Sequence, residues 1–304
     1  IIGARGRLGT AIMNTLNRIG GFQAVAIEVP KGELDAVINA APLPDVCLHR
    51  QALSLGCHVV DVTINPDLIR QMLTLDELAQ QRNLCLITMA GLAPGLTGLL
   101  AKEMLQLCPE TNCVQVSLLQ STSGTSGKQG TLEMLDLLTS PSCQFAQRPY
   151  PQFNKTQASK KSLFDFANPE LIFLPEADKL RLVTGFDSDN LNRMILALGW
   201  IRKIFPVGYY FLRGIVTQSK AKANQAADES IEIGAVTLDH AGNVLDGRYL
   251  KLDSDYGVTA AIASATTMLA IQGLPTSGAG HLSQFITLAT LLNHPVVKSH
   301  WLNG

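Results

Sequence analysis

The sequence predicts an α/β protein in which a mostly parallel sheet is followed by a second domain of the α+β class. Two observations lead to this prediction. Over residues 1–107, short apolar runs alternate with amphipathic helical patterns, which is typical of parallel strands covered by helices on both faces. From about Cys113 the pattern changes to strands that alternate polar and apolar residues, as in an antiparallel sheet.

The first element is the end of a buried strand at Ile1 and Ile2, which turns through glycines into a helix. The glycines recur at a period of three, at Gly3, Gly6 and Gly9. The apolar face of the helix follows, at Leu8, Ile12, Leu16 and Ile19. Such a helix start presents backbone N–H groups and the positive end of the helix dipole. It therefore predicts a pyrophosphate site and a Rossmann-type domain.

Each glycine of this loop has its own expected role. Gly3 makes the tight turn, Gly6 lets the phosphates approach the backbone, and Gly9 lets the helix pack closely on the strand. The other loop residues expected at the cofactor are Arg5, Arg7 and Leu8. The spacing is G-x-x-G-x-x-G rather than G-x-G-x-x-G, so a glycine-bearing loop without a ligand is the alternative.

The cofactor expected on this loop is NAD or NADP. A second strand, expected over residues 22–29, ends near Glu28, which lies 19 residues after Gly9. A carboxylate there accepts hydrogen bonds from both ribose hydroxyls and favours NAD. Arg5, Arg7 and Lys31 would instead meet a 2′-phosphate and favour NADP. The sequence leaves both cofactors open, and an ordinary solvated carboxylate is the alternative for Glu28.

The remaining elements of the first domain follow in order along the chain. Strands are expected over residues 35–41, 58–62 and 84–89, and helices over residues 44–55, from Asn65-Pro66, and from Leu96. Only five residues separate Val29 from Asp35, too few for the helix and strand usually found there. Two alternatives stay open: the sheet is abbreviated, or the sequence lacks a segment there or before Ile1. We expect this domain to span residues 1–110, with residues 275–304 packing back on it.

Residues 111–274 are expected to form the second domain. Strands are expected over residues 114–120, 230–238 and 244–252, and helices over residues 131–138, 190–204, 209–224 and 256–271. Residues 147–167 lack apolar periodicity and are expected to leave the fold as an excursion. The antiparallel sheet has edges to cover, so a homodimer through this domain is a further hypothesis.

Composition excludes several classes of function. The chain has 304 residues, of which 46% are hydrophobic and 16% charged, enough for two domains with large cores. The net charge is −1 without a basic cluster, which argues against nucleic-acid partners. No run reaches the roughly 18 apolar residues that a membrane span needs. The six cysteines form no C-x-x-C pair and no histidine lies at metal-ligand spacing, which predicts reduced thiols, no metal and a cytoplasmic protein.

Three stretches together with a late helix resemble the saccharopine dehydrogenase-like oxidoreductases. The stretches are the glycine loop, VINAAP (residues 37–42) with GCHVVDVT (residues 56–63), and AGLAPGLTGLLAKEM (residues 90–104), and the helix covers residues 256–273. The resemblance implies NAD(P) as hydride partner and a small amino- or imino-acid-like substrate with a reacting carbon–nitrogen bond. Ala93 stands where the amino-acid-linking members carry an acidic residue. Dihydrodipicolinate reductases share a similar glycine loop, but their histidine- and lysine-bearing signature is not found here.

Groups that act on a substrate are expected where strands end, because ligands of open α/β sheets bind outside the carboxyl ends of the strands. Backbone at Ala41-Pro42 and at Gly91-Leu92 is expected to line the nicotinamide ribose. The N–H groups of Gly95 and Leu96 open a helix and are expected to bind a carboxylate. Asp61 is the first candidate for proton handling, and the alternative is a cap of the turn into Asn65-Pro66.

Two further side chains are candidates for catalysis. Lys128 ends a Ser/Gly/Thr-rich loop over residues 121–130, from which its ammonium would meet an anionic substrate. A surface loop is the alternative, and the spacing excludes a nucleoside-triphosphate loop because Gln129 follows the lysine. Tyr256 opens a helix and could hydrogen-bond substrate, or else anchor the two domains. His281 is expected to pack at a helix start.

The sequence therefore favours an NAD(P)-dependent oxidoreductase acting on a small-molecule substrate. Two other classes stay open. The shortage of an obvious acid–base pair would suit a dinucleotide-binding sensor without turnover, and a structural partner would retain only the fold. Cofactor binding with and without turnover separates these hypotheses.

Overall fold

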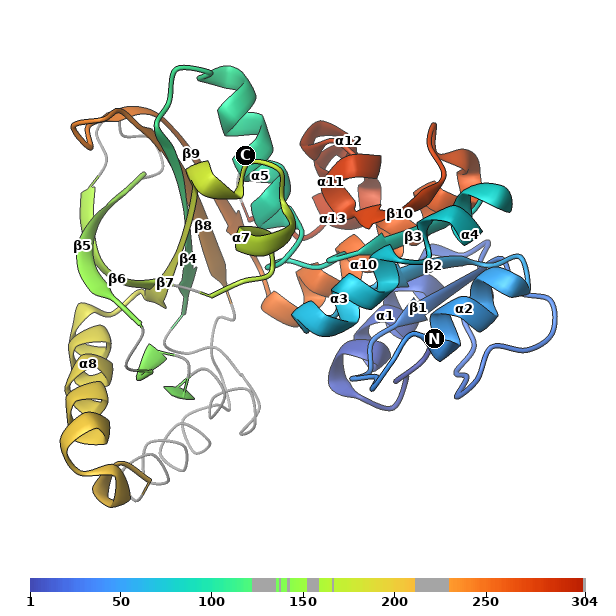
Figure 1. Cartoon of the computed structure of the whole chain (residues 1–304), viewed down its shortest axis with the longest axis horizontal. Helices are drawn as coiled ribbons and strands as arrows, with labels where there is room; N and C mark the ends of the chain where they lie inside the picture. The colour runs from blue at the N-terminus through green and yellow to red at the C-terminus, as the bar shows by residue number, and fades with distance from the viewer. Residues whose placement is uncertain are drawn as a thin grey trace. The chain divides into compact units, whose positions relative to one another are not determined.

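The computed structural model describes residues 1–121, 135–136, 138–140, 143–151, 159–165, 167–210 and 230–302. Residue contacts divide the chain into two compact units (Figure 1). The first comprises Ile1–Glu103, Asn168–Pro175 and Ser254–Trp301, and the second comprises Met104–Ala167, Glu176–Asp253 and Leu302–Gly304.

The sheet of the first unit is parallel throughout. Its strands are β1 (Ala36–Asn39), β2 (His58–Asp61), β3 (Cys85–Thr88) and β10 (Gly278–His281), in the order β1-β2-β3-β10. Ile2 forms parallel bridges to Asn39 on one side and to Ile27 on the other. From Ile2 the chain first adds Ile27 on one side, and β1 then follows on the other side of Ile2. The order of the strands therefore reverses between Ile2 and β1, which makes this place the topological switch point of the open α/β sheet.

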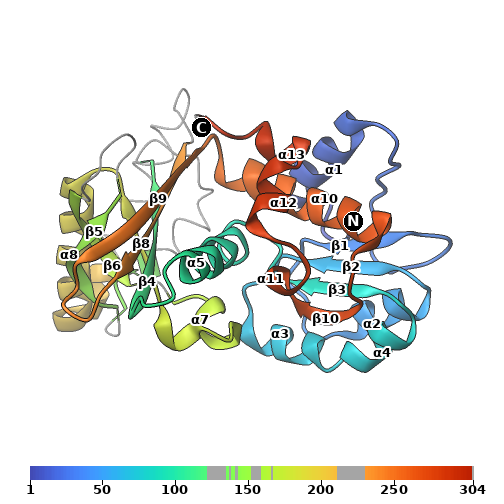
Figure 2. The ribbon, with the colours of Figure 1, turned by 90° about the horizontal axis from the view of Figure 1, so that it is seen from above.

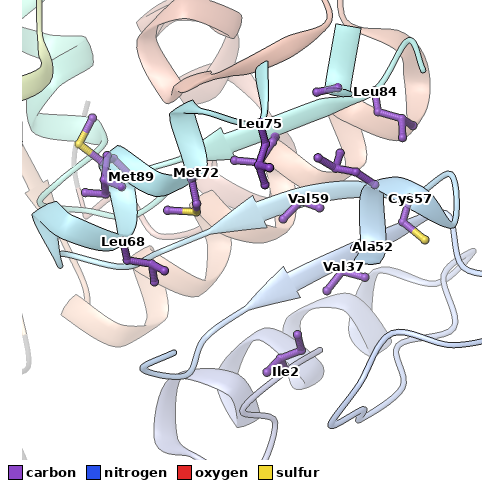
Figure 3. Packing of buried hydrophobic residues seen from close by; sticks show 14 residues of the cluster. Ile2, Val37, Ala52, Cys57, Val59, Leu68, Met72, Leu75, Leu84 and Met89 are labelled. Carbon is purple, nitrogen blue, oxygen red and sulfur yellow. The ribbon is translucent and has the colours of Figure 1, made fainter. Parts of the chain in front are cut away.

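Helices cover both faces of this sheet, as Figure 2 shows. On one face lie α1 (Arg7–Ile19) and α10 (Asp255–Gly273), and on the other lie α2 (Cys47–Ser54), α3 (Pro66–Leu73) and α4 (Asp76–Gln81). An apolar core fills the space between the strands and the second group of helices (Figure 3). Val37, Val59 and Met72 are typical members, each at most 1% exposed.

The helix α10 belongs to the first unit, although the sequence predicted its residues in the second domain, 111–274. The physical reason is its surface: 11 of its residues are buried, and most of them are small or apolar. A helix that is apolar all round has to be surrounded, and α10 packs against α1, β1 and β2. The unit also includes α5 (Leu96–Leu107) up to Glu103, α7 (Glu170–Phe173) and the C-terminal helices α11 (Leu282–Phe285), α12 (Leu288–Asn293) and α13 (Pro295–Lys298).

The strand predicted over residues 22–29 is wrong. Only Ile27 pairs, through a single bridge to Ile2, and Val25 and Val29 are 38% and 45% exposed. The segment follows the glycine pair Gly20-Gly21, and its backbone hydrogen bonds join the Val25 carbonyl to the Ile1 amino group and the Ile27 N–H to the Ile1 carbonyl.

The second unit contains a six-stranded sheet in the order β5-β6-β7-β4-β8-β9. Its strands are β4 (Cys113–Gln120), β5 (Phe145–Tyr150), β6 (Ser159–Asp165), β7 (Leu180–Phe186), β8 (Ile231–Leu238) and β9 (Val244–Leu252). All neighbours are antiparallel except β4 and β7, which are parallel. The short helix η1 (Ala177–Lys179) and α8 (Asp189–Ile204) belong to the same unit.

The predicted fold class is confirmed, as is the β8–β9 hairpin. We expected residues 147–167 to leave the fold as an excursion. For the described residues of this range that prediction is wrong, because β5 and β6 pair there in antiparallel register. These strands carry Arg148, Lys160 and Lys161, so their apolar pattern is weak in the sequence. The predicted helices over residues 131–138 and 209–224 lie mostly outside the described residues, as does the loop that carries Lys128.

Three further findings concern the described residues alone. None of their helices is both long and apolar enough to cross a membrane. No group of three or more histidine, cysteine or acidic side chains gathers there as a metal site would require. All six cysteines fall within the described ranges, and each is a free thiol, with Cys57 and Cys85 buried.

Candidate functional site

The expected cofactor residues leave the parallel sheet at its carboxyl edge. Gly3 follows Ile2 directly, and Ala41 and Pro42 follow β1 beside it. The backbone of this edge is tied together, since the Ala40 N–H donates to the Ile2 carbonyl over 3.0 Å. The glycine loop and the β1 turn therefore meet at the switch point, where open α/β sheets bind their ligands.

Gly3 and Gly9 are needed by the fold itself. Gly3 has φ +78°, and a Cβ there would lie 2.9 Å from the Ala41 Cβ. A Cβ at Gly9 would overlap the carbonyl oxygen of Gly3 and lie 2.7 Å from the Ala4 Cα. The tight turn and the close helix packing expected from the sequence are thus what the backbone shows.

Gly6 differs from its two neighbours in the motif. Its φ is −74°, which any residue adopts, and a Cβ there would have the Gly3 carbonyl oxygen as its nearest neighbour at 3.3 Å. An alanine would need that neighbour to shift by only a few tenths of an ångström. Within the described residues, the fold therefore excludes a Cβ at Gly6 less strictly than at Gly3 and Gly9.

The start of α1 is open and positively charged. Gly6 is its N-cap, no side chain of the described residues makes a capping hydrogen bond there, and the first turn holds no acidic residue. Arg5 and Arg7 are exposed beside it. The Arg7 guanidinium carbon lies 4.4 Å from the ring centroid of Tyr256, so the structure brings two predicted site residues together by a cation–π contact.

The start of α5 shows the opposite arrangement. The carboxylate of Glu170 from α7 accepts hydrogen bonds from the Gly95 and Gly98 N–H groups, both over 2.7 Å, and from the Thr97 hydroxyl. The Leu96 N–H donates to the Gly91 carbonyl. The carboxylate site that the sequence predicted at Gly95 and Leu96 is therefore occupied by the protein's own side chain, and we correct that prediction.

Sequence reasoning missed Glu170 because it lies 75 residues beyond Gly95 along the chain. The residue is 1% exposed. Burial raises the pKa of Glu170, and the hydrogen bonds from Gly95, Thr97 and Gly98 act against that rise.

Gly91 and Leu92 lie beneath the surface of this edge. Leu92 is 2% exposed, and its N–H faces the Thr259 hydroxyl on the first turns of α10 at 3.4 Å. A Cβ at Gly91 would meet the Thr259 methyl group at 3.3 Å. The loop after β3 thus packs on the same helix start that carries Tyr256. Pro42 is exposed and Ala41 half-buried.

Asp61 ends β2 with a fully buried side chain, 0% exposed. One carboxylate oxygen, Oδ2, lies 2.7 Å from the Asn39 Nδ2 and 2.6 Å from the His49 Nε2. The other, Oδ1, accepts the Thr63 N–H over 2.6 Å. The cap of α3 is a different residue, Asn65, which accepts the Asp67 N–H. Asp61 therefore reaches no solvent, and its contacts extend beyond the turn that the sequence suggested.

Comparison with known proteins adds the fold. No protein-family model matches the sequence, and no curated protein matches it. Among solved structures, apo saccharopine dehydrogenase (L-Glu forming) from Saccharomyces cerevisiae is similar with a TM-score of 0.52 at 12% identity, over 88% of this chain and 84% of that chain. The chain has the saccharopine dehydrogenase fold.

Two more solved structures are similar at lower scores. DAP dehydrogenase from C. glutamicum in complex with DAP has a TM-score of 0.41 at 14% identity, over 98% of this chain and 96% of that chain. An engineered D-amino acid dehydrogenase bound to NADP+ has a TM-score of 0.41 at 13% identity, over the same shares of the two chains. The fold that the sequence resemblance implied is confirmed by the yeast enzyme.

His49 is the second residue that sequence reasoning missed. It lies on α2 with Ala52 and Leu53, the other buried residues of that helix, and is 2% exposed. A histidine on the apolar face of a short helix, ahead of a strand that ends in aspartate, is the signal that could have found it. Glu28 and Lys31, the residues expected to discriminate between NAD and NADP, are both exposed near Ile27.

His281 ends β10 and is the N-cap of α11, so it lies at a helix start as expected. Its Nδ1 lies 2.9 Å from the Ser283 hydroxyl, and its N–H donates to the Gln284 side chain. Burial, together with the charge of Lys102, lowers the pKa of His281 to about 4. The folded protein therefore holds this imidazole in its neutral form at neutral pH.

This pKa predicts an acid-dependent loss of stability. In the unfolded chain the pKa of His281 is near its ordinary value of 6.5, whereas in the folded protein it is lowered to about 4. Stability is fully present above pH 6.5 and falls as the pH drops, by about 2 kcal/mol at pH 5 from this residue. Urea unfolding of the wild type and of His281→Gln at pH 7.5, 6 and 5 measures the effect. Parallel pH profiles for the two proteins would contradict it.

Proposed function

We propose that the protein is an NAD(P)-dependent oxidoreductase, with the dinucleotide diphosphate held by the main-chain amides of the loop from Gly3 to Gly9. The observation that carries the proposal is the contrast between two helix starts. A buried carboxylate closes the start of α5, whereas the start of α1 has no side-chain cap among the described residues and carries arginines. A helix N-terminus attracts anions, so an open, cationic one at a switch point suits a diphosphate.

Gly6 supports the same proposal from a different direction. The fold excludes a side chain there less strictly than at Gly3 and Gly9, so a ligand is a further reason for the glycine. A glycine at this place lets phosphates approach the backbone closely.

For the substrate, we propose the carbon–nitrogen bond of a small amino- or imino-acid-like molecule. The proposal is supported by the yeast saccharopine dehydrogenase, which has the same fold. Fold alone does not carry chemistry, so this part of the proposal depends on the turnover experiment below.

Gly6→Ala tests the cofactor site. The alanine is expected to keep the melting temperature near that of the wild type while weakening dinucleotide binding about tenfold, since its methyl group stands where phosphates approach. Calorimetric titration with NADH and with NADPH measures both affinities. Gly199→Ala in α8 is the matched control, because its Cβ would find its nearest neighbour at an ordinary 3.6 Å. Equal affinities of the wild type and Gly6→Ala would contradict the proposed site.

Turnover is tested separately with pooled α-keto acids and amines, following oxidation of NADH and NADPH. Oxidation above background supports the oxidoreductase. Tight binding of a dinucleotide without turnover across the pool would support a sensor instead, a hypothesis favoured by the full burial of Asp61. Absence of binding by either dinucleotide would overturn the proposal.

A further inference from the structure

We propose that Asn39, Asp61 and His49 form a buried positioning device that holds the β1 turn against the glycine loop. In this role Asp61 shapes the dinucleotide site without touching the dinucleotide. The inference deepens the proposed function and depends on it for the ligand, but the contacts that carry it are independent of any ligand.

Asn39 is the link between the carboxylate and the turn. Its Oδ1 accepts the Ala41 N–H over 3.2 Å, and its Nδ2 donates to the Ala41 carbonyl over 3.0 Å. The remaining Nδ2 hydrogen goes to Asp61 Oδ2 over 2.7 Å. Both amide hydrogens are therefore used, and the orientation of the amide is set by Asp61 on the neighbouring strand.

Asp61 has to accept hydrogen bonds at both of its oxygens. The Thr63 N–H occupies Oδ1, and Asn39 and His49 both approach Oδ2. A carboxylate satisfies all three, because an ionised aspartate is an acceptor only. His49 then contributes the hydrogen on Nε2, and its Nδ1 has no partner within the described part of the chain. Within the described residues, Asp61 is thus the only hydrogen-bond partner of the His49 ring.

The turn after β1 is in direct contact with the glycine loop, so its position affects that of the loop. Asn39 is in parallel register with Ile2, and the Ala40 N–H donates to the Ile2 carbonyl. A Cβ on Gly3 would stand 2.9 Å from the Ala41 Cβ and 3.0 Å from the Ala40 carbonyl group. With so little space at this contact, a shift of the turn must move Gly3 or open a gap beside it.

Loss of the device should therefore disturb the loop before it unfolds the domain. A buried carboxylate that loses one of its donors favours local rearrangement that brings a new donor or water to it. The group that moves most easily is the Ala40–Ala41 turn, because it lies between the buried network and the half-exposed Gly3. Displacement of a binding loop by a fraction of an ångström is enough to weaken a site.

The experiment compares His49→Phe with His49→Gln. Phenylalanine removes the donor to Asp61, whereas the glutamine amide can still donate to it. Hydrogen exchange of peptides spanning residues 1–10 and 36–42 reports the loop without any ligand, and calorimetry with NADH and NADPH reports the site. We expect faster exchange in both peptides and about tenfold weaker binding for His49→Phe, with substantial rescue in His49→Gln.

Thr88→Val is the matched control. Thr88 ends the neighbouring strand β3, is 0% exposed, and its hydroxyl has no hydrogen-bond partner among the described residues. This nearly isosteric change should leave both exchange and binding unchanged. Asp61→Asn gives a second route to the same result, since an amide places a donor against either Asn39 and His49 or the Thr63 N–H.

The outcomes separate the two proposals. Unchanged exchange of residues 1–10 in folded His49→Phe would overturn the positioning role, whatever the protein binds. Faster exchange with a wild type that binds neither dinucleotide would retain the positioning role and overturn the proposed function. A lowered melting temperature with wild-type exchange and affinity would make the three residues merely structural.

Discussion

Gly9→Ala is expected to lower the free energy of unfolding by about 3 kcal/mol, because a methyl group there is driven into backbone rather than into a flexible side chain. The Gly3 carbonyl oxygen and the Ala4 Cα both stand in its way. Neither atom can move far enough to admit a methyl group without opening the turn that joins Ile2 to α1. The strand and the helix would then separate, and the loop would lose its shape together with its stability.

Urea or thermal unfolding measures this effect. The control is again Gly199→Ala, where the new Cβ makes ordinary contacts in the interior of α8. Alanine in a helix interior is favoured over glycine by about 1 kcal/mol, so this variant should be as stable as the wild type or slightly more stable. Similar stabilities for Gly9→Ala and Gly199→Ala would show that the close approach of α1 to the turn is not needed.

Glu170→Ala is expected to lower the free energy of unfolding by about 4 kcal/mol, the second large effect. Removal of the carboxylate leaves the N–H groups of Gly95 and Gly98 and the Thr97 hydroxyl without this acceptor in a buried place. The start of α5 would then lack the anion that its dipole favours. Chemical denaturation followed by circular dichroism measures the loss.

Glu170→Gln distinguishes the acceptor from the charge. The amide keeps one oxygen for the Gly95 and Gly98 N–H groups, and the Thr97 hydroxyl can rotate to accept from the new NH₂ group. Burial disfavours a charge at this position and raises the pKa of Glu170, so we expect the neutral amide to lose less than half of the stability lost in Glu170→Ala. A loss as large as that of alanine would mean that the negative charge is required.

Local patterns predicted most of the first sheet correctly. The apolar runs at β1, β2 and β3 each place a strand within one or two residues of its observed bounds. These patterns succeed because a strand buried on both faces needs apolar residues in every register. The run over residues 22–29 failed because strand pairing also needs a partner elsewhere in the chain, and among the described residues the run makes a single bridge, from Ile27 to Ile2.

In the candidate site, too, the sequence predicted the features that depend on neighbouring residues and missed those that depend on distant ones. Gly3 and Gly9 were identified from spacing alone, because a tight turn and a close helix impose their glycines locally. Asp61 was identified as a residue of interest, but its role was not, because His49 and Asn39 approach it from other elements. Lys128, which was a catalytic candidate, lies outside the described residues and stays a prediction, as does the homodimer.

The starts of α1 and α5, each preceded by glycines, show what the sequence determines by itself and what only the tertiary structure decides. Short-range sterics and hydrogen bonding decide from neighbouring residues alone that the chain turns and begins a helix after Gly3 and again after Gly95. Whether such a start faces solvent or a buried carboxylate depends on Glu170, which arrives from 75 residues away. Charge and burial are properties of the assembled unit. The start of α5 is therefore covered by the Glu170 carboxylate, whereas the start of α1 has no side-chain cap among the described residues and carries positive charge.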